Sequence, residues 1–326
     1  MKRPELLSPE GGLGGREALP VAPSLGPSLE NAPHAPLTTG PVDGRVVVIS
    51  GLCLLLALAA GVVARLLGAL IALITNLAFF GRLSLADVSP ADNTRGAWVL
   101  VIPVLGALVV GVMARYGSKA IRGHGIPEAM EQVLLNRSRI PPRMTFLKPL
   151  SAAVAIGTGG PFGAEGPIIA TGGALGSLLG QVLRVTADER KVLLAAGAGA
   201  GMAATFGAPV SAVLLAVELL LFELKPRSLI PVALATCTAT AVRRFFVGGA
   251  PAFSVPDLVA PGGGALAFYV VLGALVGVAS VGVTRAVYAI EDAFEKLPLH
   301  WMWWPALGAL VVGAVGWVEP RTLGVG

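Results

Sequence analysis

One acidic residue, Glu165, stands among glycines and prolines inside a long apolar part of the sequence. The stretch 157–169 reads GTGGPFGAEGPII. Glycine frees the backbone and proline at a first helical turn gives up no useful hydrogen bond, so this pattern predicts a helix start. The free N–H groups and the macrodipole of such a start attract anions. The Glu165 carboxylate therefore fits two purposes: it caps the helix, or it occupies an anion site that it leaves when protonated.

A second segment of the same kind lies upstream. Residues 123–128 read GHGIPE, which again predicts a loop that leads into a helix start. A structural cap explains either segment alone, but two such starts in one apolar chain predict two positive helix ends aimed at one dehydrated anion. The candidate anion-binding residues are Gly123, His124, Gly125, Ile126, Pro127, Gly163, Gly166 and Pro167.

A third helix start, GAPVSAVLLAVE at 207–218, carries an acid about two and a half turns into its helix. This acid, Glu218, fits either a proton relay or a structural partner for Lys225 or Arg227, and we favour the structural role.

Other chemistry finds little support. A hydrolase needs a nucleophile and a base in hydrogen-bond reach, and Ser211 with His124 is the pairing to consider. No oxyanion motif surrounds this pair, so we expect the protein not to be an enzyme. Cys53 and Cys237 are isolated in apolar segments, so we expect neither a metal site nor a disulfide framework.

The elements that must position these residues are apolar helices. The chain has 326 residues, of which 55% are hydrophobic and 13% charged, and its mean hydropathy is +0.78. Soluble domains carry about 25% charged residues, so the composition predicts an all-α protein that spans a lipid bilayer several times. Short apolar pieces interrupted by glycine or proline are typical of transporters with broken helices. We expect helices at 46–80, 98–115, 126–135, 145–156, 165–183, 192–206, 209–221, 230–247, 264–293 and 301–318.

The distribution of proline and charge predicts the domain organisation and the orientation. Residues 1–43 hold eight prolines and six glycines and no apolar run, which predicts a disordered tail ahead of a transmembrane domain at 44–326. Basic loops beside apolar spans explain the net charge of +5 better than nucleic-acid binding does. The positive-inside rule puts these loops, and by span counting the N-terminus, in the cytoplasm.

The motifs GHGIPE and GAEGP and the segment GAPVSAVLLAVE resemble, in order and spacing, the CLC family of voltage-gated chloride channels and chloride–proton exchangers. The usual signatures of that family are GSGIPE and GREGP, and the resemblance covers roughly residues 46–326. It implies chloride as the bound and transported ion, no cofactor, and an anion pathway in each subunit of a homodimer. It also implies Glu165 as the gating glutamate and Lys148 as a source of positive potential.

Three positions depart from the family pattern. His124 stands where the family has a serine that helps hold the anion, and its imidazole also donates a hydrogen bond. Ala164 replaces the arginine of GREGP. Leu219 occupies the internal proton position of the exchangers, and because leucine carries no proton it favours channel-like or uncoupled transport.

The third family signature, of the G-x-F-x-P type, is not found, nor is a late tyrosine after it. We therefore expect a broken-helix fold truncated after the first inverted repeat and the start of the second. Three functions stay open: chloride transport gated by Glu165, a chloride–proton antiporter that uses another proton route, and a non-conducting truncated remnant.

Overall fold

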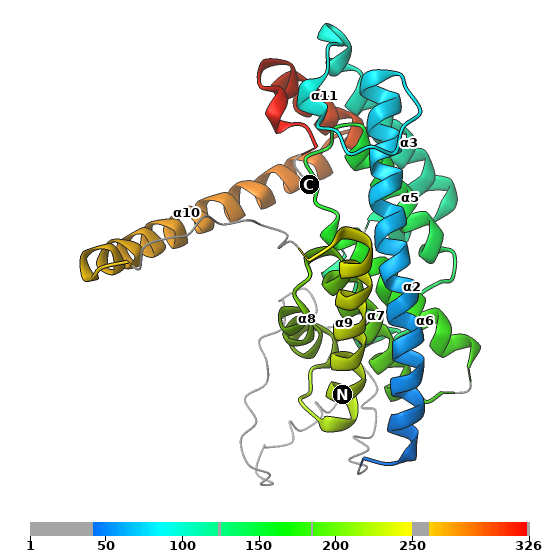
Figure 1. The fold of residues 1–326 in the computed structure, drawn as a ribbon. Helices are drawn as coiled ribbons and strands as arrows, with labels where there is room; N and C mark the ends of the chain where they lie inside the picture. Colours follow the sequence, from blue (N-terminus) through cyan, green and yellow to red (C-terminus); the bar gives the residue numbers. More distant parts are fainter. Residues whose placement is uncertain (1–41, 123–124, 184, 250–260, 325–326) are drawn as a thin grey trace, which may run out of the picture. The chain divides into compact units, whose positions relative to one another are not determined.

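The polypeptide folds as a series of helices, shown as a ribbon of the computed structural model in Figure 1. The structure describes residues 42–122, 125–183, 185–249 and 261–324, which lie within one unit, Thr38–Gly326. These residues contain no strand, which confirms the all-α prediction. The α-helices are α2 (Gly44–Thr75), α3 (Ile102–Val112), α4 (Ile126–Leu135), α5 (Met144–Gly157), α6 (Glu165–Val182), α7 (Ala187–Phe206), α8 (Pro209–Ala216), α9 (Pro226–Val247), α10 (Gly263–Glu295) and α11 (Trp304–Val318).

Short turns of other helix types extend or join the α-helices. The π-helical turns η1 (Asn76–Phe80), η4 (Met113–Gly117) and η6 (Val217–Leu221) follow α2, α3 and α8. The 3-10 turns are η2 (Pro90–Asp92), η3 (Gly96–Leu100), η5 (Lys119–Arg122), η7 (Trp301–Trp303) and η8 (Pro320–Thr322).

Long and short helices are mixed along the chain. Five segments of the described residues are long and apolar enough to cross a membrane: Gly44–Phe80, Gly96–Gly117, Pro226–Val247, Gly263–Glu295 and Trp301–Val318. Apolar pieces such as α5 and α8 are shorter than a hydrocarbon core about 30 Å thick requires. This mixture agrees with the broken-helix prediction.

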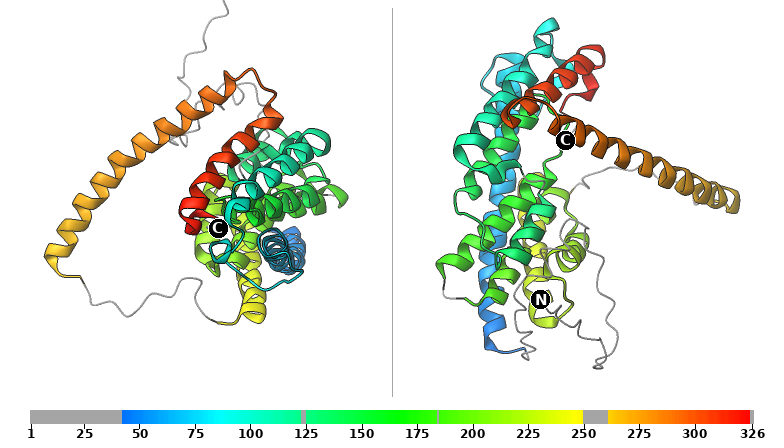
Figure 2. Two further views of the ribbon diagram at one scale, coloured as in Figure 1. Left: turned by 90° about the horizontal axis from the view of Figure 1, so that it is seen from above. Right: turned by 180° about the vertical axis from the view of Figure 1, so that it is seen from behind.

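The core lies where α6 and α7 pack side by side (Figures 1 and 2). Gly172 of α6 faces Gly197 of α7, and a Cβ on either glycine would collide with the backbone of the other. One turn further along α6, Gly176 meets the backbone of Leu193 in the same way. Small residues at such crossings let two backbones approach in a membrane, where the hydrophobic effect supplies no drive between helices.

Further helices surround this crossing. α2 and α9 both pack against α7 and against each other, with Gly61 of α2 seated on Val242 of α9. α3 and the preceding turn η3 pack against α11, where Gly313 lies on the backbone of Leu100 in η3. α10 differs, because none of its residues is buried in the described structure.

Two helices begin four or five residues earlier than the sequence patterns predict. α7 begins at Ala187 rather than at 192 because a capping box forms in front of it. In that box the Thr186 hydroxyl accepts from the Glu189 N–H at 3.2 Å, and the Glu189 carboxylate accepts from the Thr186 N–H at 2.8 Å. α9 begins at Pro226 rather than at 230, since proline fits a first helical turn.

Candidate functional site

The start of α6 has the form that the GAEGP motif predicts. Glu165 is the first helical residue and Pro167 lies within the first turn, while Ala164 supplies no side-chain cap. The first hydrogen bond of the helix runs from the Ile168 N–H to the Ala164 carbonyl at 3.0 Å. The N–H groups of Glu165 and Gly166 therefore lie ahead of the helical ladder, where an anion would find them.

The Glu165 side chain is exposed and makes no hydrogen bond or ion pair within the described part of the chain. Its carboxylate makes no cap hydrogen bond to its own helix, so any capping would rest on the macrodipole alone. A carboxylate at a helix start without a fixed partner is able to move.

The start of α4 follows the same rule. Gly125 is buried and has φ of +78°, a left-handed conformation that favours glycine, and Ile126 and Pro127 open the helix. The predicted anion ligands Gly123 and His124 lie outside the described residues, so their roles stay predictions.

The two helix starts meet. A Cβ on Gly125 would lie 2.6 Å from the Cα of Gly166, so the two backbones are in contact at the first residues of α4 and α6. This places the GHGIPE and GAEGP motifs side by side although about 40 residues separate them in the sequence. The positive N-terminal ends of α4 and α6 therefore lie next to each other. That both ends bind the same anion stays a prediction.

Lys148 of α5 is buried against the start of α4. Its side chain is 6% exposed, and its Nζ lies 2.9 Å from Oε2 of Glu128 and 3.1 Å from the carbonyl oxygen of Ile121. Glu128, in the first turn of α4, therefore has a cationic partner that Glu165 lacks. The charge of Lys148 is balanced in part by this carboxylate.

Two arginines that the sequence reasoning did not assign lie beside the start of α6. A cavity of about 360 Å³ is lined by Ala164 together with Arg65 of α2 and Arg243 of α9. Arg243 Nε donates to the Thr205 carbonyl at 3.3 Å. Asp87 also lines the cavity, but in the described residues it forms no ion pair with either arginine. The signal in the sequence was Arg65, the sole charge in an apolar run of 35 residues at 46–80.

The prediction that Glu218 pairs with Lys225 or Arg227 is wrong. Glu218 is exposed in the π-helical turn η6 and makes no ion pair within the described residues. Lys225 and Arg227 instead face Glu223, at 2.9 Å and 3.9 Å. The reason is the left-handed turn at Phe222 (φ 54°), which ends η6 and turns the chain before Glu223. Leu219, by contrast, packs on the hydrophobic core.

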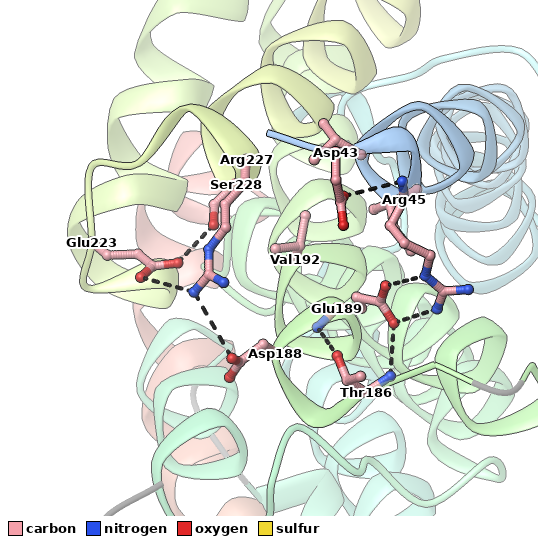
Figure 3. Close-up of a pocket in the computed structure, with 11 residues that line it drawn as sticks. Asp43, Arg45, Thr186, Asp188, Glu189, Val192, Glu223, Arg227 and Ser228 are labelled. Atoms are coloured by element: carbon pink, nitrogen blue, oxygen red, sulfur yellow. Dashed lines mark hydrogen bonds and ion pairs between the residues drawn. The ribbon is translucent and has the colours of Figure 1, made fainter. Parts of the chain in front are cut away.

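A charged cluster joins the first turns of α2, α7 and α9 around a cavity of about 280 Å³ (Figure 3). Arg45 reaches across to Glu189 with two hydrogen bonds of 2.8 Å. Arg227 lies between Asp188 and Glu223, both at 3.9 Å. Burial would raise the pKa of Glu223, but hydrogen bonds from Ser228 and Lys225 outweigh it and hold that pKa below its ordinary value. This cluster ties helix ends together and is distant in sequence from both glycine–proline motifs.

Comparison with known proteins identifies the family of this chain. Residues 105–326 match the family model for voltage gated chloride channels. The chain belongs to the voltage gated chloride channel family.

Two relatives are about 30% identical to the chain over the aligned regions. It is 32% identical over 213 residues to the H⁺/Cl⁻ exchange transporter ClcA of Vibrio campbellii, covering 61% of this chain and 44% of the relative. It is 30% identical over 237 residues to the chloride channel protein CLC-e of Arabidopsis thaliana, covering 69% of this chain and 33% of the relative. The chain thus spans a third to a half of the length of these curated relatives.

Solved structures show the same fold. A slow cyanobacterial Cl⁻/H⁺ antiporter superposes with a TM-score of 0.68 at 24% identity, over 84% of this chain and 64% of that one. A eukaryotic CLC transporter superposes with a TM-score of 0.66 at 21% identity, over 85% and 50%. With its apolar helices, this likeness makes the chain a multi-pass membrane protein of the CLC fold.

Proposed function

We propose that this chain forms part of a chloride pathway in which Glu165 is the gate. The observation that carries the proposal is the contact between Gly125 and Gly166, which brings two helix N-termini together. The carboxylate beside them, Glu165, has no partner within the described ranges. Chloride would bind the N–H groups ahead of α4 and α6, and Glu165 would compete with it for the same donors. Protonation removes the negative charge of Glu165 and leaves the donors to the anion.

The cations near the site have different roles in this proposal. Arg65 and Arg243 line the cavity beside Ala164 and supply, from other helices, positive charge that Ala164 does not carry. They would raise the local chloride concentration at the approach to Glu165. Lys148, paired with Glu128, would mainly hold the start of α4 in position and add a smaller potential.

Several further properties belong to the proposal. The chain acts by moving anions and not by catalysing a reaction, in keeping with the names of its relatives. It works as a homodimer with one pathway per subunit. Residues 1–43 form a cytoplasmic tail, and 44–326 form the membrane-embedded part with its basic loops in the cytoplasm. Residues 1–41 of that tail lie outside the described residues.

Chloride efflux from proteoliposomes that contain the 326-residue protein tests the proposal. We expect valinomycin-dependent chloride release, read with a chloride electrode, that exceeds release from protein-free liposomes. The matched variant is Arg65→Gln with Arg243→Gln, which should slow release at low chloride and approach the parent at high chloride. Release no faster than from empty liposomes would favour the non-conducting remnant.

A second candidate, chloride–proton exchange, rests on Glu218. This carboxylate is exposed and unpaired among the described residues, and it adjoins Leu219 at the internal proton position. It therefore remains available as another proton stop. A chloride gradient that drives protons uphill, with the movement lost in Glu218→Gln, would establish exchange. Chloride movement without protons would establish a channel or uncoupled transporter.

A further inference from the structure

The turn between α4 and α5 is fixed in place by α6. Ser177 Oγ donates to the Ser138 carbonyl at 2.6 Å and accepts from the Ile140 N–H at 2.8 Å. Gln181 Nε2 donates to the Ile140 carbonyl at 2.9 Å. We call residues 136–141 the arginine turn, because it holds Arg137 and Arg139. Its backbone is therefore set before any ligand arrives.

The backbone of the arginine turn is unusual. Arg137 and Ser138 have φ values of 50° and 59°, so two consecutive residues that are not glycine adopt the left-handed conformation. Strained backbone that surrounding contacts enforce is concentrated at functional sites. Ser138 is buried, whereas Arg137 and Arg139 are exposed and line a surface hollow of about 490 Å³.

A third arginine donates a hydrogen bond to the backbone of this turn. Arg190 of α7 is only 6% exposed, and its Nε donates to the Arg137 carbonyl at 3.0 Å. In the described part of the chain, no carboxylate pairs with any of the three guanidinium groups. Burial, and then repulsion from Arg139 and Arg137, lowers the pKa of Arg190. Three positive charges thus lie together without a carboxylate partner among the described residues.

The hollow offers hydrogen-bond donors besides charge. Gln132 and Asn136 line it, and the Asn136 Nδ2 donates to Gln132 Oε1 at 2.8 Å. Both side chains are neutral, so they leave the positive potential of the hollow intact. Planar guanidinium groups suit the tetrahedral oxygens of phosphate, which they bind in a bidentate way.

Contacts with α7 connect the arginine turn to the start of the apolar run of α2. Arg45 directly precedes that run and contacts Glu189 at 2.8 Å. The next residue, Arg190, contacts the arginine turn. The turn is therefore linked through α7 to the place where the apolar part of α2 begins, where we expect the boundary of the hydrocarbon region.

We propose that the arginine turn is a binding site for a phosphate group, of the kind that an anionic phospholipid headgroup carries. The site is separate from Glu165 and goes beyond the proposed pathway. A bound phosphate would supply the missing counter-charge and lock α4, α5, α6 and α7 together at the membrane surface. Each arginine near such a surface contributes roughly a fivefold gain in binding of anionic lipid.

Titration of the whole purified protein in neutral detergent tests this site. The probe is dioctanoyl phosphatidylglycerol, compared with dioctanoyl phosphatidylcholine and with inorganic phosphate, and the readout is the midpoint of thermal unfolding followed by tryptophan fluorescence. Ligands that bind only the folded state raise this midpoint in a saturable way. We expect phosphatidylglycerol to raise it and phosphatidylcholine not to.

The deciding variant is Arg137→Gln with Arg139→Gln, since both side chains are exposed. Its apparent affinity for phosphatidylglycerol should fall by roughly 25-fold. Without lipid its midpoint should be unchanged or higher, because repulsion with Arg190 is relieved. A rise with inorganic phosphate that is lost in the same variant would keep the phosphate site and assign it to a soluble ligand.

A charge-matched control keeps the proposal falsifiable. Arg115→Gln with Arg244→Gln removes two exposed arginines elsewhere and should keep the affinity within about twofold of the parent. Equal loss of affinity in both double variants would mean diffuse attraction rather than a site. Equal affinity in the parent and the Arg137 and Arg139 variant would overturn the proposal outright.

Discussion

The starts of α4 and α6 look alike in sequence but carry acids in opposite situations. Glu128, in the first turn of α4, is held 2.9 Å from the buried Lys148. Glu165, at the first position of α6, is exposed and has no partner among the described residues. Both acids lie within three residues of a glycine and a proline, and the positive end of a helix favours both carboxylates.

The helix start itself therefore does not decide what an acid does. A cation from a third helix fixes Glu128 as part of the scaffold, whereas Glu165 has no partner among the described residues. The scaffold acid should therefore matter for stability, and the free acid for transport.

The largest effect on stability should come from Lys148→Met. Removal of one partner from a buried ion pair leaves an uncompensated charge, which costs about 3–5 kcal/mol. Thermal unfolding in detergent should show a clearly lower midpoint than the parent. Glu128→Gln combined with Lys148→Met should recover much of the loss. If the double variant is as unstable as the single one, the pair is not what Lys148 contributes.

The second-largest loss of stability should come from a substitution at the contact between the two helix starts. Gly125→Ala places a Cβ 2.6 Å from the Gly166 Cα and also strains a residue with φ of +78°. We expect a loss of about 1–3 kcal/mol together with reduced chloride flux.

Gly248→Ala separates the two causes in that variant. Gly248 has a similar φ of +85°, but a Cβ there meets open space. It should therefore show the backbone strain without the collision and keep its flux. An equal loss of flux in both variants would argue against the contact between α4 and α6 as the feature that matters.

The smallest stability effect concerns Glu223 and depends on pH. Because its folded pKa is depressed, Glu223 stabilises the protein above its ordinary value of 4.5, and this contribution is lost as pH falls through the folded pKa. Ser228→Ala removes the 2.6 Å hydrogen bond and should cost about 1 kcal/mol at pH 7. The cost should shrink below pH 4.5.

Glu218→Gln is the natural comparison for that experiment, since Glu218 is exposed and lies five residues earlier. Its stability should stay within about 0.5 kcal/mol of the parent at every pH. A pH-dependent change in Glu218→Gln as large as in Ser228→Ala would contradict the assignment of partners.

The sequence predicted those parts of the fold that depend on local pattern. α4 and the start of α6 begin at the predicted residues because glycine and proline fix them chemically. α7 begins early because its first turn is charged, and apolar periodicity does not detect the capping box at Thr186 and Glu189. The Lys148–Glu128 pair, the cavity with Arg65 and Arg243, and the true partners of Lys225 join residues far apart or across a turn. Such pairings depend on tertiary packing, and local patterns in a single sequence do not reveal which distant residues come into contact.

The most direct test of the division between the two acids is chloride flux of Glu165→Gln as a function of external pH. Glutamine mimics the protonated carboxyl and does not compete as an anion, so flux should become largely independent of pH while the unfolding midpoint stays near that of the parent. The parent should conduct more as external pH falls. If Glu165→Gln keeps the pH dependence of the parent, Glu165 is not the gate and the central claim is wrong.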